Sequence, residues 1–284
     1  MTAHNRERFI VEAIESVLAS SLTDFELIIV DDRSTDATVE VARRYTSDSR
    51  VRLRVNEKNL GDYPNRNRAA SHARGKYLKY LDSDDTLYAH GLAVMVAALE
   101  KFPEAGFGLE RPDFPDKPYP VAVSPVEAYR EHFLGEGLFG CGPSGTMIRA
   151  DAFRAVGGFR EMRWVSDTDL WLRLGARWPT VKFTRGLMWW RQHAGQQTHS
   201  ETAFTVGAKF RVVLEVLNDS ACPLGAAART EAIRRVRWWY ARQVWHHALR
   251  RGRIKFAGEL FRACQFNPAE LMRGLFPLRP RDVP

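Results

Sequence analysis

Apolar residues recur along the first hundred positions with two alternating periods. Residues 8–19 carry them at helical spacing, and this stripe predicts an amphipathic helix. Further helices are expected near 39–42 and 65–73. The runs 25–30, 51–55 and 77–81 are short and rich in β-branched, aromatic or leucine side chains, which predicts strands. Strand and helix taking turns is typical of a doubly wound α/β sheet.

The pattern changes twice farther along the chain. Six prolines between residues 102 and 125 disfavour a helix there, and we place a boundary in this stretch. A second region, 126–200, mixes glycine-rich loops with an amphipathic helix near 170–174, and beyond Thr202 the pattern stays helical. The expected organisation is an α/β domain over 1–200, with halves 1–110 and 111–200, followed by a helical region over 201–284.

Acidic residues follow two of the expected strands directly. Asp31 and Asp32 end one apolar run, and Asp82, Asp84 and Asp85 end another. In an open parallel sheet the ligand crevice lies beyond the carboxyl ends of the strands, so these acids should converge on one site. A hard divalent ion binds one or two carboxylates together with phosphate oxygens. The arrangement therefore indicates metal and nucleotide chemistry.

Charge is spread unevenly over the 284 residues. The net charge is +8, and residues 201–284 hold 15 Lys and Arg against 7 Asp and Glu, whereas the preceding residues are neutral. The three cysteines are widely spaced, which suits a reducing compartment and argues against a disulfide framework or a zinc site. We recognise no membrane-spanning run and no signal peptide, and expect a cytoplasmic protein.

A series of motifs in order resembles the family 2 glycosyltransferases of the GT-A fold over roughly residues 2–200. The first lies at 5–18, the second is Asp24 to Asp36, and the approach to a D-x-D motif includes Asn59-Leu60-Gly61, Arg66-Asn67 and Gly75-Lys76-Tyr77. The D-x-D motif itself is Asp82-Ser83-Asp84. Gly157-Gly158-Phe159, Asp167 to Arg173 and Arg191-Gln192-His193 resemble the acceptor-side and late histidine motifs.

This resemblance implies a GT-A-like doubly wound sheet with a Rossmann-like nucleotide-binding half and an acceptor half, and a C-terminal helical extension. It implies an inverting, metal-dependent glycosyltransferase. The expected donor is a nucleotide-diphosphate sugar, with a UDP-sugar favoured, and the expected acceptor is a hydroxyl group of a glycan or lipid-linked molecule. The implied cofactor is Mn²⁺ or Mg²⁺. Such enzymes serve polysaccharide biosynthesis and the cell envelope.

The resemblance also implies a role for each matching residue. Asp32 would accept a hydrogen bond from the base, with Thr2 and Arg66 in the same pocket. Asp82 and Asp84 would meet the ribose and the metal, with Asp84 as the direct ligand. The remaining two residues are Asp167, as general base on the acceptor hydroxyl, and His193, which would complete the metal shell or touch the diphosphate.

Each role has a simpler structural alternative. Asp31 and Asp36 are interpreted as caps of the following helix rather than as ligands. Asp82 and Asp84 could form a solvated turn, although clustered acids are costly to bury without a partner. Asp167 also suits a helix N-terminus, where a cap and a base are compatible.

The chain departs from the family pattern at two places. The family usually has Glu-Asp where this chain has Ser166-Asp167, which leaves the acceptor open. The family's first strand precedes the equivalent of Thr2, and we expect it to be missing here. An added segment of about five upstream residues, the usual length of a strand, is expected to raise the melting temperature.

Arginine and tryptophan alternate at helical spacing in residues 234–256. Such a helix can lie on the inner face of an anionic membrane, or it can form a lid with its tryptophans buried. Nucleic-acid binding is a weaker interpretation, because no reader motif is present. A non-catalytic nucleotide-sugar-binding protein remains an alternative to the transferase, as does a nucleotidyltransferase, for which a glycine-rich phosphate loop is lacking.

Overall fold

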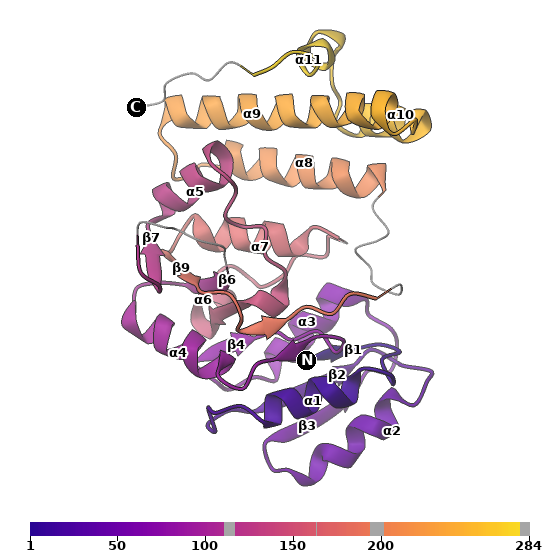
Figure 1. The fold of residues 1–284 in the computed structure, drawn as a ribbon, viewed down its shortest axis with the longest axis vertical. Helices are drawn as coiled ribbons and strands as arrows, with labels where there is room; N and C mark the ends of the chain where they lie inside the picture. The colour runs from indigo at the N-terminus through magenta and orange to yellow at the C-terminus, as the bar shows by residue number, and fades with distance from the viewer. Residues whose placement is uncertain (111–116, 163, 194–201, 279–284) are drawn as a thin grey trace.

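The computed structural model describes residues 1–110, 117–162, 164–193 and 202–278. Figure 1 shows an α/β part and, stacked on one side of it, a layer of helices from the C-terminal third of the chain. The helices of the α/β part are α1 (Ile10–Leu18), α2 (Thr38–Arg43), α3 (Asp62–Ser71), α4 (Gly91–Lys101), α5 (Pro125–Leu134), α6 (Ala150–Ala155) and α7 (Ser166–Gly175).

The strands form two neighbouring sheets and a short ribbon. The first sheet is parallel, in the order β1 (Thr2–Ala3), β2 (Leu27–Asp31), β3 (Val51–Val55). The second has the order β4 (Tyr77–Lys79), β8 (Thr146–Arg149), β6 (Phe107–Glu110), β9 (Thr180–Phe183), β7 (Val121–Val123). The ribbon pairs β5 (Thr86–Leu87) with β10 (Met188–Trp189). A parallel bridge between Thr2 and Asp82 joins the two sheets.

The elements expected between residues 8 and 81 are present, with ends that shift by a few residues. The first strand was expected to be missing, and this is wrong for its carboxyl end, because Thr2 and Ala3 pair with β2 as β1. The proline-rich stretch contributes β6 and β7 to the larger sheet, where both pair with β9. The division into domains and halves stays a prediction.

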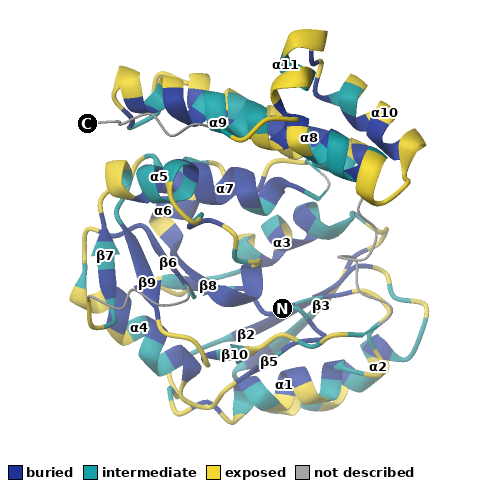
Figure 2. Ribbon diagram, turned by 45° about the horizontal axis from the view of Figure 1, so that its top comes forward, coloured by how far each residue is buried: buried dark blue, intermediate teal, exposed yellow. Residues whose placement is uncertain are grey.

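Two apolar clusters enclose the sheets, and Figure 2 shows the strands as a buried layer between helices. One joins α1, β2 and α4 through Ile14, Ile29 and Met95, and the other joins β6 and α7 through Phe107 and Trp171. Each such side chain stabilises the fold by about 1.5–3 kcal/mol when fully buried. Carboxylates at the strand ends are therefore held on a rigid frame.

The C-terminal layer comprises α8 (Ala203–Asn218), α9 (Ala226–Trp245), the π-helix η4 (His246–Arg250), α10 (Ile254–Ala263) and α11 (Pro268–Arg273). It has a core of its own around Phe210, Tyr240 and Leu260, and α8 and α9 also pack against α7 and α5. None of the helices in the described ranges combines the length and the hydropathy that a membrane crossing requires.

Candidate active site

Asp32 follows β2 and is almost completely buried. Its Oδ1 atom accepts hydrogen bonds from the Leu60 amide and from Asn56 Nδ2, both at 2.8 Å, and its Oδ2 atom accepts one from the Gly61 amide at 2.8 Å. Gly61 has φ = +86°, a conformation that suits glycine. A carboxylate has about four acceptor sites. The three bonds fix the orientation of Asp32 and leave one site on Oδ2 for a further donor.

The neighbouring acids have local roles, although neither is the N-cap of α2, which is Ala37 and has no side-chain cap bond. Asp31 accepts from the Ser34 amide at 2.8 Å, and Asp36 accepts from the Thr38 amide at 3.0 Å. Both bonds satisfy backbone groups around the start of α2. The structure thus separates Asp32, which is held by a distant loop, from two acids that close a turn.

Arg66 lies buried on α3 between two carboxylates. Its Nη2 atom donates to Asp82 Oδ1 at 2.6 Å, and its Nε atom donates to Asp62 Oδ1 at 3.0 Å. Burial lowers the pKa of Arg66, but Asp82 and Asp62 outweigh this effect and raise it. The Nη1 atom is buried and has no hydrogen-bond partner among the described residues. An unpaired buried donor is costly, so this atom favours a ligand with an acceptor group.

Asp82 is the point where three of the predicted binding residues meet. It is bridged to Thr2 and paired with Arg66, and its backbone amide donates to Ser144 Oγ at 3.0 Å. Burial raises the pKa of Asp82, but the Arg66 guanidinium overcomes this and holds it below the ordinary value. Asp82 is therefore a carboxylate at neutral pH.

Asp84 and His193 lie together although 109 residues separate them in the chain. His193 Nε2 is 3.1 Å from Asp84 Oδ2, and Arg6 Nε donates to the same oxygen at 3.2 Å. Arg191 holds this contact in place, because its Nε atom donates to the Asp84 carbonyl at 2.8 Å and its amide donates to Asp85 at 3.1 Å. The predicted metal ligands are thus brought together.

This pair fits a divalent cation whose other ligands come from a substrate. In the described part of the chain, no three His, Cys, Asp or Glu side chains gather to hold an ion. Mg²⁺ is ordinarily bound by one or two carboxylates plus substrate phosphates, and carboxylate also suits Mn²⁺. Asp84 and His193 would supply two ligands, and the Arg6 contact to Asp84 would give way to the ion.

Asp167 lies in the first turn of α7 and is partly exposed. Its Oδ1 atom accepts from the Thr168 amide at 2.6 Å, and burial is the main cause that raises its pKa. The Arg66 guanidinium acts on both Asp82 and Asp167, while the buried Tyr63 hydroxyl is influenced by Asp167. Asp167 thus bonds within the first turn of α7, whose N-cap residue is Val165, and its role as a base stays a prediction.

Ser166, the first residue of α7, faces inward. It is completely buried, and its hydroxyl group contacts the backbone of Arg160 and Met162. This hydroxyl closes the loop before α7 and is not presented to an acceptor. Position 158 requires glycine for structural reasons. Its φ is +68°, and a Cβ atom there would lie 2.7 Å from Asn67 Oδ1.

Sequence reasoning missed the roles of Arg6 and Arg191, which both contact Asp84. Both were visible inside motifs, at 5–9 and 191–193, but the motifs say nothing about which side chains turn inward.

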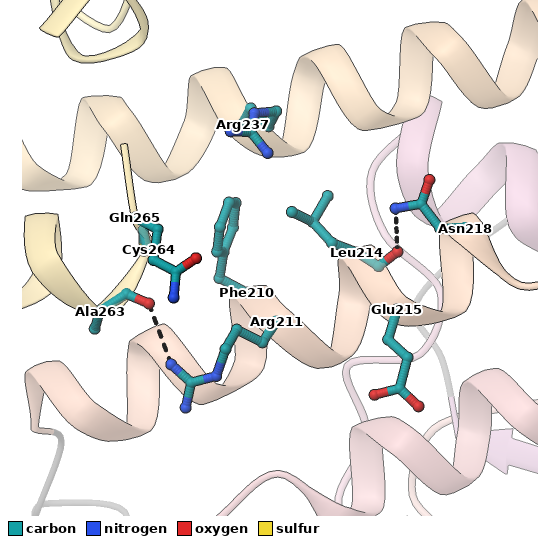
Figure 3. A pocket seen from close by; sticks show the side chains of 9 residues that line it. All are labelled: Phe210, Arg211, Leu214, Glu215, Asn218, Arg237, Ala263, Cys264 and Gln265. Carbon is teal, nitrogen blue, oxygen red and sulfur yellow. Dashed lines mark hydrogen bonds between the residues drawn. The ribbon is translucent and has the colours of Figure 1, made fainter. Parts of the chain in front are cut away.

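A separate cavity of about 280 Å³ lies between α8, α9 and the end of α10 (Figure 3). None of the predicted site residues lines this cavity.

A family model described as glycosyl transferase family 2 matches residues 1–157. EpsE of Bacillus subtilis (strain 168), named as a glycosyltransferase, is 35% identical over 183 residues, which cover 61% of this chain and 64% of EpsE. The Escherichia coli protein named UDP-Glc:alpha-D-GlcNAc-diphosphoundecaprenol beta-1,3-glucosyltransferase WfgD is 36% identical over 101 residues, 36% of this chain and 40% of WfgD. The match thus spans less than two thirds of either relative.

Two solved structures share the fold. S. aureus TarS 1–349 in complex with UDP-GlcNAc has a TM-score of 0.71 at 18% identity, covering 92% of this chain and 77% of that chain. The mannosyltransferase PcManGT from Pyrobaculum calidifontis, in complex with GDP-Man and Mn²⁺, has a TM-score of 0.63 at 15% identity, covering 93% and 73%. The GT-A-like fold expected from the sequence is confirmed. Since the family model also matches more than half of its residues, this chain belongs to glycosyl transferase family 2.

Proposed function

We propose that this chain is an inverting, metal-dependent glycosyltransferase that moves a sugar from a UDP-linked donor to a hydroxyl group of a glycan or lipid-linked acceptor. One observation carries the proposal. The segment Asp82–Ser83–Asp84 is joined to Arg66 through its first carboxylate and to His193 through its second. A solvated turn, the simpler alternative, gives no reason for two such distant partners.

The nucleotide would lie between Asp32 and Arg66. The open acceptor site on Asp32 Oδ2 suits the N3–H group of uracil, and the unpaired Arg66 Nη1 suits an oxygen acceptor of the ligand. Thr2 lies beside them, bridged to Asp82. The choice of UDP is supported by the names of TarS, bound to UDP-GlcNAc, and of WfgD, a UDP-Glc enzyme.

Asp84 and His193 would hold the divalent cation, Mn²⁺ or Mg²⁺. When bound, such an ion stabilises the negative charge that grows on the leaving diphosphate. Arg6 donates to the Asp84 carboxylate and Arg191 to the Asp84 backbone carbonyl, so both would add positive potential near the place where the diphosphate would lie. The complex of PcManGT with Mn²⁺ supports a metal in a protein of this fold.

Asp167 would act as the general base. It takes the proton of the acceptor hydroxyl while that oxygen forms a bond to the anomeric carbon and the bond from this carbon to the diphosphate oxygen breaks. A single displacement of this kind inverts the anomeric centre. A raised pKa makes the carboxylate a better proton acceptor. A lipid-linked acceptor, supported by the name of WfgD, would bring the enzyme to the surface of an anionic membrane.

Nucleotide binding is the first test. We would measure the melting temperature with UDP, GDP, dTDP and CMP, each with and without Mn²⁺. A ligand that binds only the native state stabilises it by about 2.7 kcal/mol at a hundredfold excess over Kd. We expect a shift with UDP that needs Mn²⁺ and is lost in Asp84→Ala.

The matched control is Asp24→Ala, because Asp24 is an exposed acid before β2 and its loss should leave the UDP shift unchanged. A shift with none of the four nucleotides would refute the proposed donor class. A UDP shift of equal size with and without Mn²⁺ would refute the metal role alone. With UDP-sugars and an acceptor, NMR of the product would report the anomeric configuration.

A further inference from the structure

The end of the C-terminal layer exposes a short basic segment that the glycosyl transfer reaction does not use. Residues 249–255, here named the basic turn, run from the end of η4 to the start of α10 and are all exposed. Two of them are large aliphatic residues, Leu249 and Ile254, with 69% and 74% of their surface exposed. The turn also holds Arg250, Arg251, Arg253 and Lys255, and no acidic residue.

Contacts with two buried residues, His247 and Phe256, fix the backbone of the basic turn. The Arg253 amide donates to the His247 carbonyl at 2.8 Å, and the Arg253 guanidinium lies 4.1 Å from the centre of the Phe256 ring. His247 and Phe256 are both buried and their rings are 4.3 Å apart. Gly252 has φ = +62° and permits the reversal. Leu249 and Ile254 thus face outward on a supported backbone.

The charges of the basic turn differ from those of the helix that precedes it. In α9, Arg234 and Arg235 pair with the buried Glu231, and Arg237 pairs with Glu270. No carboxylate of the described chain forms an ion pair with a cation of the basic turn. The first group of arginines is part of the fold, whereas the second group presents uncompensated positive charge.

This distinction corrects the surface expected from the sequence. The stretch 234–256 was interpreted as one interfacial helix, yet Tyr240 and Val244 are buried in the layer core. The Trp238 and Trp245 indoles donate to the carbonyls of Phe276 and Leu271. Most of α9 is therefore a packed element, although its tryptophans are not buried as the lid alternative predicted, since Trp239 is 48% exposed. The basic turn lies beyond the end of α9.

We infer that the basic turn docks on an anionic lipid surface, with Leu249 and Ile254 inserted among the acyl chains and the four cations at the headgroups. Apolar side chains beside uncompensated cations match the boundary between acyl chains and anionic headgroups. Nucleic acid fits less well, because the turn has no aromatic side chain on which a base could stack. The purpose of this docking rests on the proposed function, since it brings a lipid-linked acceptor to the enzyme.

The test is flotation of the full chain with vesicles. We expect binding to vesicles of phosphatidylcholine with phosphatidylglycerol, little binding to phosphatidylcholine alone, and a decrease with salt, because salt screens exposed charges. The triple variant Arg250→Gln/Arg251→Gln/Lys255→Gln should lower the partition coefficient at least tenfold. Arg253 is left unchanged because it packs on Phe256.

The control removes three exposed cations elsewhere, in Arg43→Gln/Arg54→Gln/Lys101→Gln. Residues 43 and 54 lie on α2 and β3, across the molecule from α10 (Figure 1), and this variant should bind vesicles as the natural chain does. Equal losses in both triple variants would overturn the inference, because net charge alone would explain them. So would unchanged binding of Leu249→Ser/Ile254→Ser, which would identify a general polyanion surface.

Failure here is distinguishable from failure of the proposed function. Vesicle binding is measured without nucleotide, and the UDP and Mn²⁺ shift is measured without lipid. A chain that shows the shift but does not bind anionic vesicles would remain a transferase and lose this inference. A chain that binds vesicles through the basic turn but shows no shift would keep the docking surface and lose the donor assignment.

Discussion

A buried arginine lies near each end of strand β4, and the two side chains are satisfied differently. At the end where β4 begins and β8 ends, Arg149 donates to the Ala105 and Leu99 carbonyls at 2.7 Å and to the Tyr77 hydroxyl at 3.1 Å. Each of its three nitrogen atoms has a partner. This guanidinium joins β8 to the end of α4 and has no nitrogen atom without a partner.

Near the other end of β4, Arg66 pairs with Asp82 and Asp62. Its third nitrogen, Nη1, is buried and lacks a partner within the described residues. Both arginines are buried cations. They differ in whether every guanidinium nitrogen atom has a hydrogen-bond partner. A complete set of partners indicates a structural role, whereas an incomplete set beside paired carboxylates indicates a binding site.

The largest effect on activity is expected for Asp167, the carboxylate proposed as the general base. Asp167→Asn removes the proton acceptor and keeps the side-chain shape, so kcat should fall about 10²- to 10⁴-fold. The melting temperature and the UDP-induced shift should change little, because the amide oxygen can still accept from Thr168. Initial rates with UDP-sugar and acceptor, together with thermal scans, measure both.

The control for this variant is Asp151→Asn. Asp151 is an exposed acid in the first turn of α6 and also accepts from a neighbouring backbone amide, so it matches the cap role without the site. If both variants lost activity equally, or if Asp167→Asn lost less than about tenfold, well below the effect of a positioned base, Asp167 would be a cap only.

The comparison of the two arginines gives the next prediction. Arg149→Gln should lower the free energy of unfolding by about 3 kcal/mol, because charge-assisted bonds to buried carbonyls are lost, while the folded fraction should bind UDP normally. Arg66→Gln should weaken UDP binding about 10- to 100-fold, corresponding to the loss of a hydrogen bond from a charged donor. Urea unfolding and calorimetric titration provide the two readouts.

Arg66→Lys sharpens this prediction, because lysine keeps the charge but loses the planar fork. Arg66→Lys should retain part of the natural chain's free energy of unfolding, and it should recover a smaller part of the natural chain's UDP affinity. If Arg149→Gln weakened UDP binding as strongly as Arg66→Gln, the distinction between a structural Arg149 and a ligand-binding Arg66 would be wrong.

The pH dependence of activity reports on Asp167. Burial raises its pKa above the ordinary value of 3.8, so the protonated, inactive form persists to higher pH than for an exposed aspartate. Activity is therefore lost as the pH falls through this raised pKa, and kcat/KM should drop about tenfold per pH unit below it. An acid limb at or below pH 3.8, measured with saturating Mn²⁺, would contradict the assignment.

Much of the fold could be predicted because the hydrophobic periods are local properties of the sequence. The stripe of α1 and the alternation of β3 were recognisable, whereas β6 and β7 were not, because a short strand among prolines gains its pairing only from distant β9. The two-residue strand β1 was not expected for a similar reason, because its pairing depends on β2 and Asp82, which flank it.

The candidate site was predictable to the extent that its residues stand in motifs. The motifs named Asp84 and His193, and the structure brings them to 3.1 Å. They could not show that Arg6 contacts the same oxygen, that Ser166 turns into the loop before α7, or that Arg66 keeps an unpaired nitrogen. Side-chain direction and hydrogen-bond accounting depend on contacts across the chain, which periodicity does not encode.

Lys79 tests the comparison of the two ends of β4 most finely, because it is a structural cation at the end that lies near the candidate site. Its Nζ atom donates to the carbonyls of Tyr80 and Ser144, and burial lowers its pKa to about 8, against the opposing effect of nearby acids and Cys141. Between pH 8 and the ordinary value of 10.5, the unfolded chain binds more protons than the folded one, so stability rises with pH in this window. Relative to Lys79→Met, whose side chain does not titrate, the natural chain should gain about 2 kcal/mol from pH 8 to 10.5. Urea unfolding of both proteins at several pH values measures this difference. A constant difference would show that Lys79 is not desolvated, and a change in UDP affinity in Lys79→Met would assign it to the site instead of the fold.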